Sequence, residues 1–545
     1  MPPRPNVLLI VTDQQRGDML GAAGRLPIRT PAADRLCAEG AMFTRAYATT
    51  PVCVPCRATL LSGQYPSRHG VWLNGVVTPQ DILSLPRLLS QRGGYRTAMI
   101  GKSHLQPGRA GKLDPGTWEY AEPNGVDVGI EAAPRSRDWD FFRSWSGPWY
   151  GFEHARINVG HTYREYAYSM HFGLFLHESG IPMEPPYFMS YAEAEALVGT
   201  HGAAGLPSAR AELTDPGPAR WALPEQYHSS TWVADETVAY LREHTSMHPD
   251  RPFYASVNFP DPHPPFVVPE PWDTMYDGVE LPPPSRRLGE WEGKPAYYRA
   301  NIDNRVAESG WHKSFLPPRQ LPLLTPSSER VGLEERWWRT YMGMQSLVDK
   351  QLGRILDELD TLGLGEDTLV IATSDHGDSM GDHFIWHKGG CHYDGTARVP
   401  LVVRWPGRVP AGLRSASLQS LVDLPATILS AAGLEPEPRM QGVDELAAWT
   451  DPDVSCRDGV LIEQRLEAGL HVNTWITDRY RLSVHNDLAH ELTELELYDL
   501  QEDPEELDSL AGDRGHRRLA DELLAEAWRE TISVQSPWLE RVTGS

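Results

Sequence analysis

The chain has 545 residues, of which 40% are hydrophobic and 23% charged, and its 18 tryptophans need a core or a pocket, so the composition excludes a disordered chain. No apolar run approaches the roughly 20 residues of a membrane-spanning helix, which excludes a membrane protein. The formal net charge of -24 predicts a surface that repels nucleic acids and anionic lipids, so an anionic substrate must bind in a local basic pocket.

The first apolar run, at 7–11, is too short for the apolar region of a signal peptide, and no small-residue cleavage site follows it. We therefore expect a cytoplasmic protein. The five cysteines are an odd and sparse set for a chain of this length, which argues against a disulfide framework.

Four apolar runs are typical of buried strands in a parallel sheet, because each is nearly continuous and is bounded by turn residues. They cover residues 6–12, 97–100, 253–259 and 368–373. In open α/β sheets the ligand site lies beyond the carboxyl ends of the strands. The sequence therefore predicts a site built from the polar residues that follow these runs, which are Asp13 and Gln14, Lys102 and His104, Asp261 and His263, and Asp375 and His376.

Other segments predict helices, insertions and a hairpin. Apolar residues at a three-or-four spacing from Tyr341 to Leu359 predict an amphipathic helix. Residues 106–235 are rich in glycine, proline and aromatic residues, and we interpret them as long insertions over the upper edge of the sheet. Near the C-terminus, alternation at 471–476 and 480–484 predicts an antiparallel hairpin, and 517–531 predicts a closing helix.

These elements predict an α/β fold with two domains. The catalytic domain, with a large central sheet flanked by helices, covers residues 1–440, and a smaller α+β domain covers residues 441–545. The insertions and the C-terminal region offer surfaces that suit a homo-oligomer.

The most informative motif starts at Cys53 and reads CVPCR at 53–57 and LSG at 61–63. Taken alone, Cys53 and Cys56 form a CxxC pair, which occurs in redox proteins and in zinc sites. Neither a thioredoxin-like unit nor a second pair of zinc ligands accompanies it. The pattern Cys-x-Pro-x-Arg followed by Leu-Ser-Gly resembles instead the signature of type I, formylglycine-dependent sulfatases of the alkaline phosphatase superfamily.

This resemblance covers nearly the whole chain and lies close to the arylsulfatase and phosphonate monoester hydrolase branch, with further ordered matches at 5–13, 30–36, 395–401 and 496–500. It implies an alkaline-phosphatase-like fold. It also implies that a formylglycine-generating enzyme converts Cys53 to formylglycine (3-oxoalanine). The hydrated aldehyde would attack sulfur and then collapse to release sulfate, a second step that a plain thiol or hydroxyl cannot perform. Arg57 would hold the formylglycine oxygen and compensate nearby charge.

The same resemblance implies one divalent cation, held by Asp13, Gln14, Asp375 and His376. Gln14 stands where many sulfatases have aspartate, as it does in phosphonate monoester hydrolases and choline sulfatases, and His376 stands where many have asparagine. Ca²⁺ is the expected ion, but each change removes or softens an oxygen ligand, so Mn²⁺ becomes a real competitor, and Mg²⁺ is a further alternative. Three nearby residues are interpreted as loop residues, namely Asp378, Asp382 and His383.

The remaining matches imply a basic pocket for the sulfuryl group. Lys102 and Lys388 would neutralise its oxygens as charge develops. His263 would protonate the leaving oxygen, and His104 would take the proton released when the hydrated aldehyde collapses. Two further residues are candidates for substrate binding, Asn74 and His387, and His387 is the main alternative for part of the acid–base work.

We therefore expect hydrolysis of sulfate esters of small organic molecules, in the manner of an arylsulfatase. The first alternative is a phosphonate monoester or phosphodiester hydrolase, which Gln14 and the expected cytoplasmic location favour. Lys102 and His104 argue against it, because phosphonate hydrolases that resemble this family carry uncharged residues there. A non-catalytic binding protein would need unmodified Cys53, and a redox or metal-binding CxxC protein is the remote third alternative.

Overall fold

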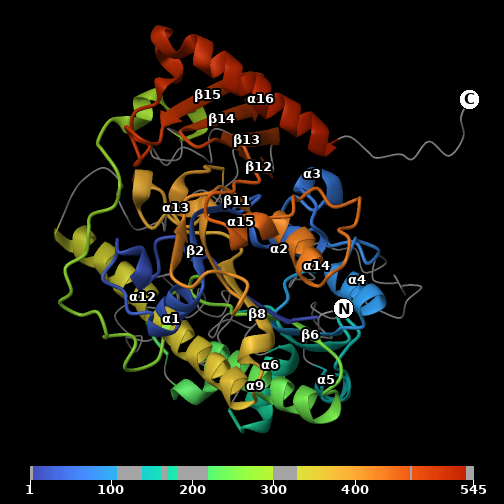
Figure 1. Cartoon of the computed structure of the whole chain (residues 1–545). Helices are drawn as coiled ribbons and strands as arrows, with labels where there is room; N and C mark the ends of the chain where they lie inside the picture. The colour runs from blue at the N-terminus through green and yellow to red at the C-terminus, as the bar shows by residue number, and fades with distance from the viewer. Residues whose placement is uncertain are drawn as a thin grey trace, which may run out of the picture.

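The computed structural model describes residues 4–106, 138–160, 169–181, 219–221, 223–298, 328–388, 390–466 and 469–535. A mixed sheet lies at the centre of the molecule, and helices cover both of its faces (Figure 1). In this part of the chain, no helix combines the length and the apolar character needed to cross a membrane.

The central sheet has a parallel block at its middle. Its strands in chain order are β1 (Asn6–Thr12), β2 (Ala41–Tyr47), β3 (Arg96–Lys102), β4 (His154–Asn158), β6 (Phe253–Asn258), β8 (Thr368–Ser374), β9 (Arg398–Arg404), β10 (Leu413–Ser415) and β11 (Gln419–Ser420). The order across the sheet is β10-β2-β9-β8-β1-β6-β3-β4, and β11 also pairs with β2. The strands from β8 to β4 run parallel, whereas β9 is antiparallel to β8 and β2.

The side chains of β1 explain why its sequence is an uninterrupted apolar run. Successive side chains of a strand point to opposite faces of the sheet. Val7, Leu9 and Val11 belong to the core on one face, and Leu8 and Ile10 belong to the core on the other. Since both faces are covered by helices, every position of the strand must be apolar.

Helices on each face form these two cores with the sheet. One face is covered by α2 (Cys53–Ser62), α4 (Leu85–Gly93) and α14 (Asp423–Ala431). The opposite face is covered by α1 (Pro31–Glu39), α9 (Ser229–Met247) and the long α12 (Ser328–Thr361), which gather on the other side of the sheet in Figure 1. Shorter elements are α3 (Pro66–His69), α5 (Trp139–Ser144), α6 (Met170–Glu178), α13 (Asp394–Ala397), α15 (Leu446–Thr450), and the paired strands β5 (Ala219–Arg220) and β7 (Val267–Val268).

The C-terminal region forms a second, antiparallel sheet. Its strands are β12 (Val460–Arg465), β13 (Leu470–Ile476), β14 (Tyr480–Asp487) and β15 (Leu492–Asp499), paired in that order. Helix α16 (Arg517–Gln535) packs on this sheet through Ala520, Leu523 and Ala527 (Figure 1). This region lies beside the α2 and α13 side of the central sheet.

The predicted α/β fold is confirmed, and so are its main elements. The four predicted strands are β1, β3, β6 and β8, the amphipathic helix is α12, the hairpin is β13–β14 and the closing helix is α16. The domain boundary at residue 440 stays a prediction. The segment 106–235 contributes more than insertions, because its described parts include β4 at the edge of the central sheet. The rest of that prediction falls largely outside the described residues.

Candidate active site

Helix α2 presents Cys53 as its first residue. Val52 offers no side-chain oxygen to cap the helix, and Oδ1 of Asn74 instead accepts a hydrogen bond from the backbone N–H of Val54 (3.0 Å). The helix ends at Ser62, and the next residue, Gly63, has a φ of 66°, which a residue without a Cβ adopts readily. Asn74, a predicted substrate-binding residue, therefore lies beside Cys53 and caps its helix.

Strands β1 and β8 bring two carboxylates together. They are neighbours in register, with Thr12 opposite Ser374, so Asp13 and Asp375 leave the sheet side by side. Both are completely buried. The Asp375 N–H donates to the Thr12 carbonyl (3.1 Å), and the Gln14 N–H donates to Asp375 Oδ1 (3.1 Å), which fixes the two strand ends to each other.

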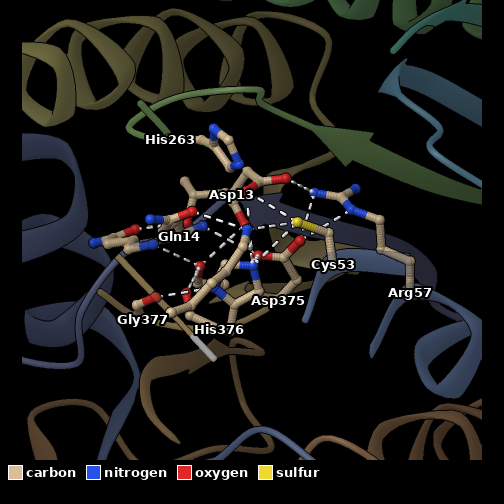
Figure 2. A network of polar contacts seen from close by, with 12 residues as sticks. Asp13, Gln14, Cys53, Arg57, His263, Asp375, His376 and Gly377 are labelled. Carbon is tan, nitrogen blue, oxygen red and sulfur yellow. Dashed lines mark hydrogen bonds and ion pairs between the residues drawn. The ribbon is translucent and has the colours of Figure 1, made fainter. Parts of the chain in front are cut away.

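Four donor groups meet at this edge of the sheet. Asp13, Cys53, Asp375 and His376 each offer one ligand atom, and these atoms all lie within 4.8 Å of one another (Figure 2). Cys53 Sγ lies 3.2 Å from His376 Nε2 and 3.8 Å from Asp13 Oδ1. His376 Nδ1 donates to the Gly377 carbonyl (2.9 Å), so the other ring nitrogen, Nε2, is the one that faces the cluster.

The ammonium group of Lys388 lies among these donors and stands in for a cation. Its Nζ is 2.9 Å from Gln14 Oε1, 2.8 Å from Cys53 Sγ and 2.9 Å from His376 Nε2. Carboxylate and amide oxygens suit Ca²⁺, Mg²⁺ or Mn²⁺, and the imidazole nitrogen adds one softer ligand. The arrangement of these side chains therefore fits the divalent cation that the sequence predicts.

Arg57 lies behind the cluster and neutralises both carboxylates. Its Nη2 is 3.0 Å from Asp13 Oδ2, and its Nε donates to Asp375 Oδ2 (3.0 Å). Its Nη1 donates to the Lys102 carbonyl (3.0 Å) and to Asn258 Oδ1 (3.3 Å). The positive charge of Arg57 therefore lies against both carboxylates. In the described ranges Arg57 makes no hydrogen bond to Cys53, so its contact with a formylglycine oxygen stays a prediction.

The predicted basic residues surround the same point. Lys102 ends β3, and its Nζ lies 2.7 Å from Asp13 Oδ2. The preceding Gly101 has a φ of 95°, and a Cβ there would lie 2.1 Å from the Asn258 carbonyl oxygen, so glycine permits the close approach of β3 to β6. Burial lowers the pKa of both His104 and His263, and the Cys53 thiol acts on each imidazole in the opposite direction. Figure 2 shows His263 on one side of Asp13 and His376 on the other.

Opposing charges control the ionisation of the buried groups. Burial raises the pKa of Asp375, and the neighbouring Asp13 carboxylate raises it further. Burial also opposes ionisation of Asp13, but Lys102 and the other cationic groups hold the pKa of that carboxyl well below its ordinary value. Burial and the Asp13 carboxylate both raise the pKa of the Cys53 thiol. Lys388 and His376 outweigh them, so that this pKa lies well below its ordinary value. The cluster therefore holds anionic groups that depend on adjacent positive charge.

Asp378 belongs to the site, although the sequence suggests only a loop residue. Its Oδ2 accepts a hydrogen bond from Gln14 Nε2 (2.5 Å) and lies 3.6 Å from His387 Nδ1. The only sequence signal was its position two residues after His376. The other two residues interpreted as loop residues make ion pairs outside the cluster, Asp382 with Arg16 and His383 with Glu290.

The mixed sheet, the donor cluster at the carboxyl ends of β1 and β8, and the small antiparallel sheet together define an alkaline-phosphatase-like hydrolase. The chain belongs to the sulfatase family. The family model described as Sulfatase matches residues 5–434, and a second model, described as N-sulphoglucosamine sulphohydrolase, C-terminal, matches residues 381–532. The family that the Cys53 motif indicates is thereby confirmed.

Relatives of known activity include both sulfatases and phosphonate hydrolases. An arylsulfatase of Clostridium perfringens is 25% identical over 95% of this chain and 93% of its own. The multifunctional alkaline phosphatase superfamily protein PehA of Trinickia caryophylli is 30% identical over 79% of this chain and 74% of its own. The crystal structure of a phosphonate monoester hydrolase of Agrobacterium radiobacter superposes with a TM-score of 0.72 at 27% identity, covering 97% of this chain and 96% of that one.

Proposed function

We propose that this hydrolase cleaves sulfate esters of small organic molecules, in the manner of an arylsulfatase, with formylglycine made from Cys53 as its nucleophile. The observation that carries the proposal is the position of Cys53. It starts a buried helix and lies among side chains that can ligate a cation, and Lys102 and Lys388 contact this cluster. A formylglycine-generating enzyme would be needed for maturation. Once hydrated, formylglycine would supply an oxygen nucleophile at this position.

The cation site would consist of Asp13, Gln14, Asp375 and His376, with Ca²⁺ as the expected ion. When bound, the cation would supply charge stabilisation and increase the acidity of the nucleophilic hydroxyl. Arg57 keeps Asp13 and Asp375 in place through two 3.0 Å hydrogen bonds. It therefore orients the carboxylates and limits the repulsion between them.

Lys102 and Lys388 would bind the sulfuryl oxygens. Both ammonium groups lie at the cluster, 2.7 Å from Asp13 Oδ2 and 2.8 Å from Cys53 Sγ respectively. Lys102 is buried and Lys388 is partly buried, so water screens their charges less than it would at the surface. His104 would take a proton from the nucleophile, since burial lowers the pKa of its imidazole and keeps it neutral, and the Cys53 thiol is among the groups that act on it.

His263 would donate a proton to the leaving oxygen. Burial, and after it the Lys388 ammonium, lower the pKa of His263 to about 3, so the imidazole is neutral in the free protein near pH 7. Proton donation from it therefore requires the negative charge that a bound sulfate ester brings to the pocket. His387, partly exposed and beside Lys388, is the alternative proton donor.

Replacing His263 with alanine is expected to slow alkyl sulfates far more than nitrophenyl sulfate, by about 10²-fold or more against less than about tenfold. A poor leaving group needs protonation in the transition state, whereas nitrophenolate does not. The measurement is kcat/KM across a series of esters with graded leaving-group pKa. A uniform loss across the series would assign proton donation to another residue, with His387→Ala as the next variant to assay.

A phosphonate monoester hydrolase is the second candidate function. It is supported by Gln14 in the donor set and by the 27% identical phosphonate monoester hydrolase structure. Sulfate monoesters and phosphonate monoesters both present a tetrahedral centre with a single negative charge, so one site can act on both. Lys102 and His104 at the cluster favour the sulfate ester.

The proposed preference is tested by kcat/KM for nitrophenyl sulfate and for a nitrophenyl phosphonate monoester, measured side by side on protein co-expressed with a formylglycine-generating enzyme. We expect the sulfate to be preferred by at least about tenfold, a difference of roughly 1.4 kcal/mol in transition-state binding. A preference of that size for the phosphonate would establish the second function instead.

A further inference from the structure

The side-chain amide of Gln14 is held between two groups with opposite hydrogen-bonding requirements. Its Nε2 donates to Asp378 Oδ2 (2.5 Å), and its Oε1 accepts from Lys388 Nζ (2.9 Å). A carboxylate can only accept and an ammonium can only donate, so both partners require the same one of the two amide orientations. A cation in place of the ammonium makes the same demand, because only the amide oxygen can ligate it.

Asp378 is itself rigidly held. It is completely buried, and its Oδ1 accepts a hydrogen bond from the backbone N–H of Met380 (2.8 Å). Its Oδ2 faces both Gln14 Nε2 and His387 Nδ1, the latter at 3.6 Å. The ring of His387 in turn stacks on Trp337, with 6.2 Å between ring centroids. The carboxylate therefore has little freedom to follow the amide if the amide turns.

We propose that Asp378 is a positioning residue, whose carboxylate keeps Oε1 of Gln14, and not Nε2, directed at the cation site. A neutral amide has one end that binds a cation and one that repels it, and the energy difference between its two orientations must come from a neighbour. Asp378 supplies that difference on the side away from the cation. The inference rests on the proposed function only in that it assumes a divalent cation at this site.

The test is the affinity of chelator-treated protein for Ca²⁺ alone, measured by isothermal titration calorimetry. Asp378→Ser is the informative variant, because the serine hydroxyl can still accept from the Met380 N–H but is too short to reach Gln14. We expect the dissociation constant for Ca²⁺ to rise by about 10–100-fold, the usual cost of losing a group that orients a metal ligand. Thermal unfolding of each variant shows whether it is folded.

The same substitution made in a Gln14→Glu variant distinguishes a positioning role of Asp378 from a role in holding its loop together. In Gln14→Glu the two carboxylate oxygens are equivalent, so no wrong orientation exists and Asp378 has nothing to position. The two adjacent carboxylates repel each other instead. Asp378→Ser should therefore improve Ca²⁺ binding in the Gln14→Glu background while weakening it in the wild-type background, a reversal of sign that a double-mutant cycle measures directly.

Asp378→Asn provides the same comparison with nearly unchanged shape, in case the serine variant does not fold. Its one side-chain oxygen can still accept from Gln14 but must be shared with the Met380 N–H. In the wild-type background we therefore expect a smaller loss of Ca²⁺ affinity than for Asp378→Ser. A gain is expected in the Gln14→Glu background, because the asparagine amide can donate to the introduced carboxylate.

Equal losses in both backgrounds, or no loss in the wild-type background, would overturn the positioning role. Wild-type protein that binds no Ca²⁺ or Mn²⁺ would overturn both this inference and the proposed function, whereas wild-type binding that Asp378→Ser leaves unchanged would overturn this inference alone.

Discussion

Cys53→Ala is expected to abolish turnover, with a loss of about 10⁵-fold or more, the size of effect seen when a hydrolase loses its covalent nucleophile. Alanine cannot be converted to formylglycine, and it leaves no oxygen nucleophile at the start of α2. Asp13, Gln14, Asp375, His376 and both lysines are unchanged in this variant, so substrate analogues should still bind. Sulfate ester hydrolysis and analogue affinity, measured on the same preparation, separate the two effects.

Cys56→Ser is the matched control for this variant. Cys56 lies in the same helix and is also completely buried, but it packs in the apolar core under α2, and burial raises the pKa of its thiol well above the ordinary value. It should therefore stay a thiol, and its replacement should retain most of the activity with some loss of stability. Mass spectrometry of the peptide that contains Arg57 should find the aldehyde at position 53. An intact Cys53 in fully active protein, or equal losses of activity in the two variants, would contradict the sulfatase mechanism and support a redox or metal-binding CxxC pair instead.

The central strands and the polar residues at their ends could be predicted because both follow from burial. An uninterrupted apolar run such as β1 arises only where both faces of a strand are covered, and the chain must turn polar where the strand leaves the core. Since β1, β3, β6 and β8 are parallel neighbours, Asp13, Lys102, His263 and Asp375 meet at one edge. The strand ends therefore predict the carboxylates and basic residues of the site, whereas Cys53 comes from the start of helix α2.

Features that depend on contacts between distant segments could not be predicted in the same way. Strand β4 lies at the sheet edge and mixes polar with apolar residues, so it lacks the continuous apolar run. Asn74 caps α2 from a separate loop, which no local pattern indicates. Asp378 contacts Gln14 across 364 positions of sequence, and its role depends on which way one amide faces. Such information is held in the tertiary structure alone.

Asp375→Asn is expected to remove most of the cation affinity. The loss should exceed about 10–100-fold, which is the usual cost of removing a residue that only orients a metal ligand. Asp375 is completely buried, and each of its oxygens already has a fixed donor, Gln14 N–H at Oδ1 and Arg57 Nε at Oδ2. An asparagine would place an NH₂ group opposite one of these donors and would remove a negative charge from the donor set. We expect turnover to fall by about 10³-fold, equivalent to roughly 4 kcal/mol of lost transition-state stabilisation.

The thermal stability of the protein gives a readout of this loss that does not depend on catalysis. A ligand that binds only the folded state stabilises it by about 2.7 kcal/mol at a concentration of 100 times its dissociation constant. Ca²⁺ should therefore raise the unfolding temperature of the wild type and leave that of Asp375→Asn nearly unchanged. Asp382→Asn is the matched control, since Asp382 is a buried carboxylate that pairs with Arg16 (2.7 Å) outside the cluster. It should unfold at a lower temperature than the wild type yet keep its full response to Ca²⁺, and a wild-type response in Asp375→Asn would contradict the assigned cation site.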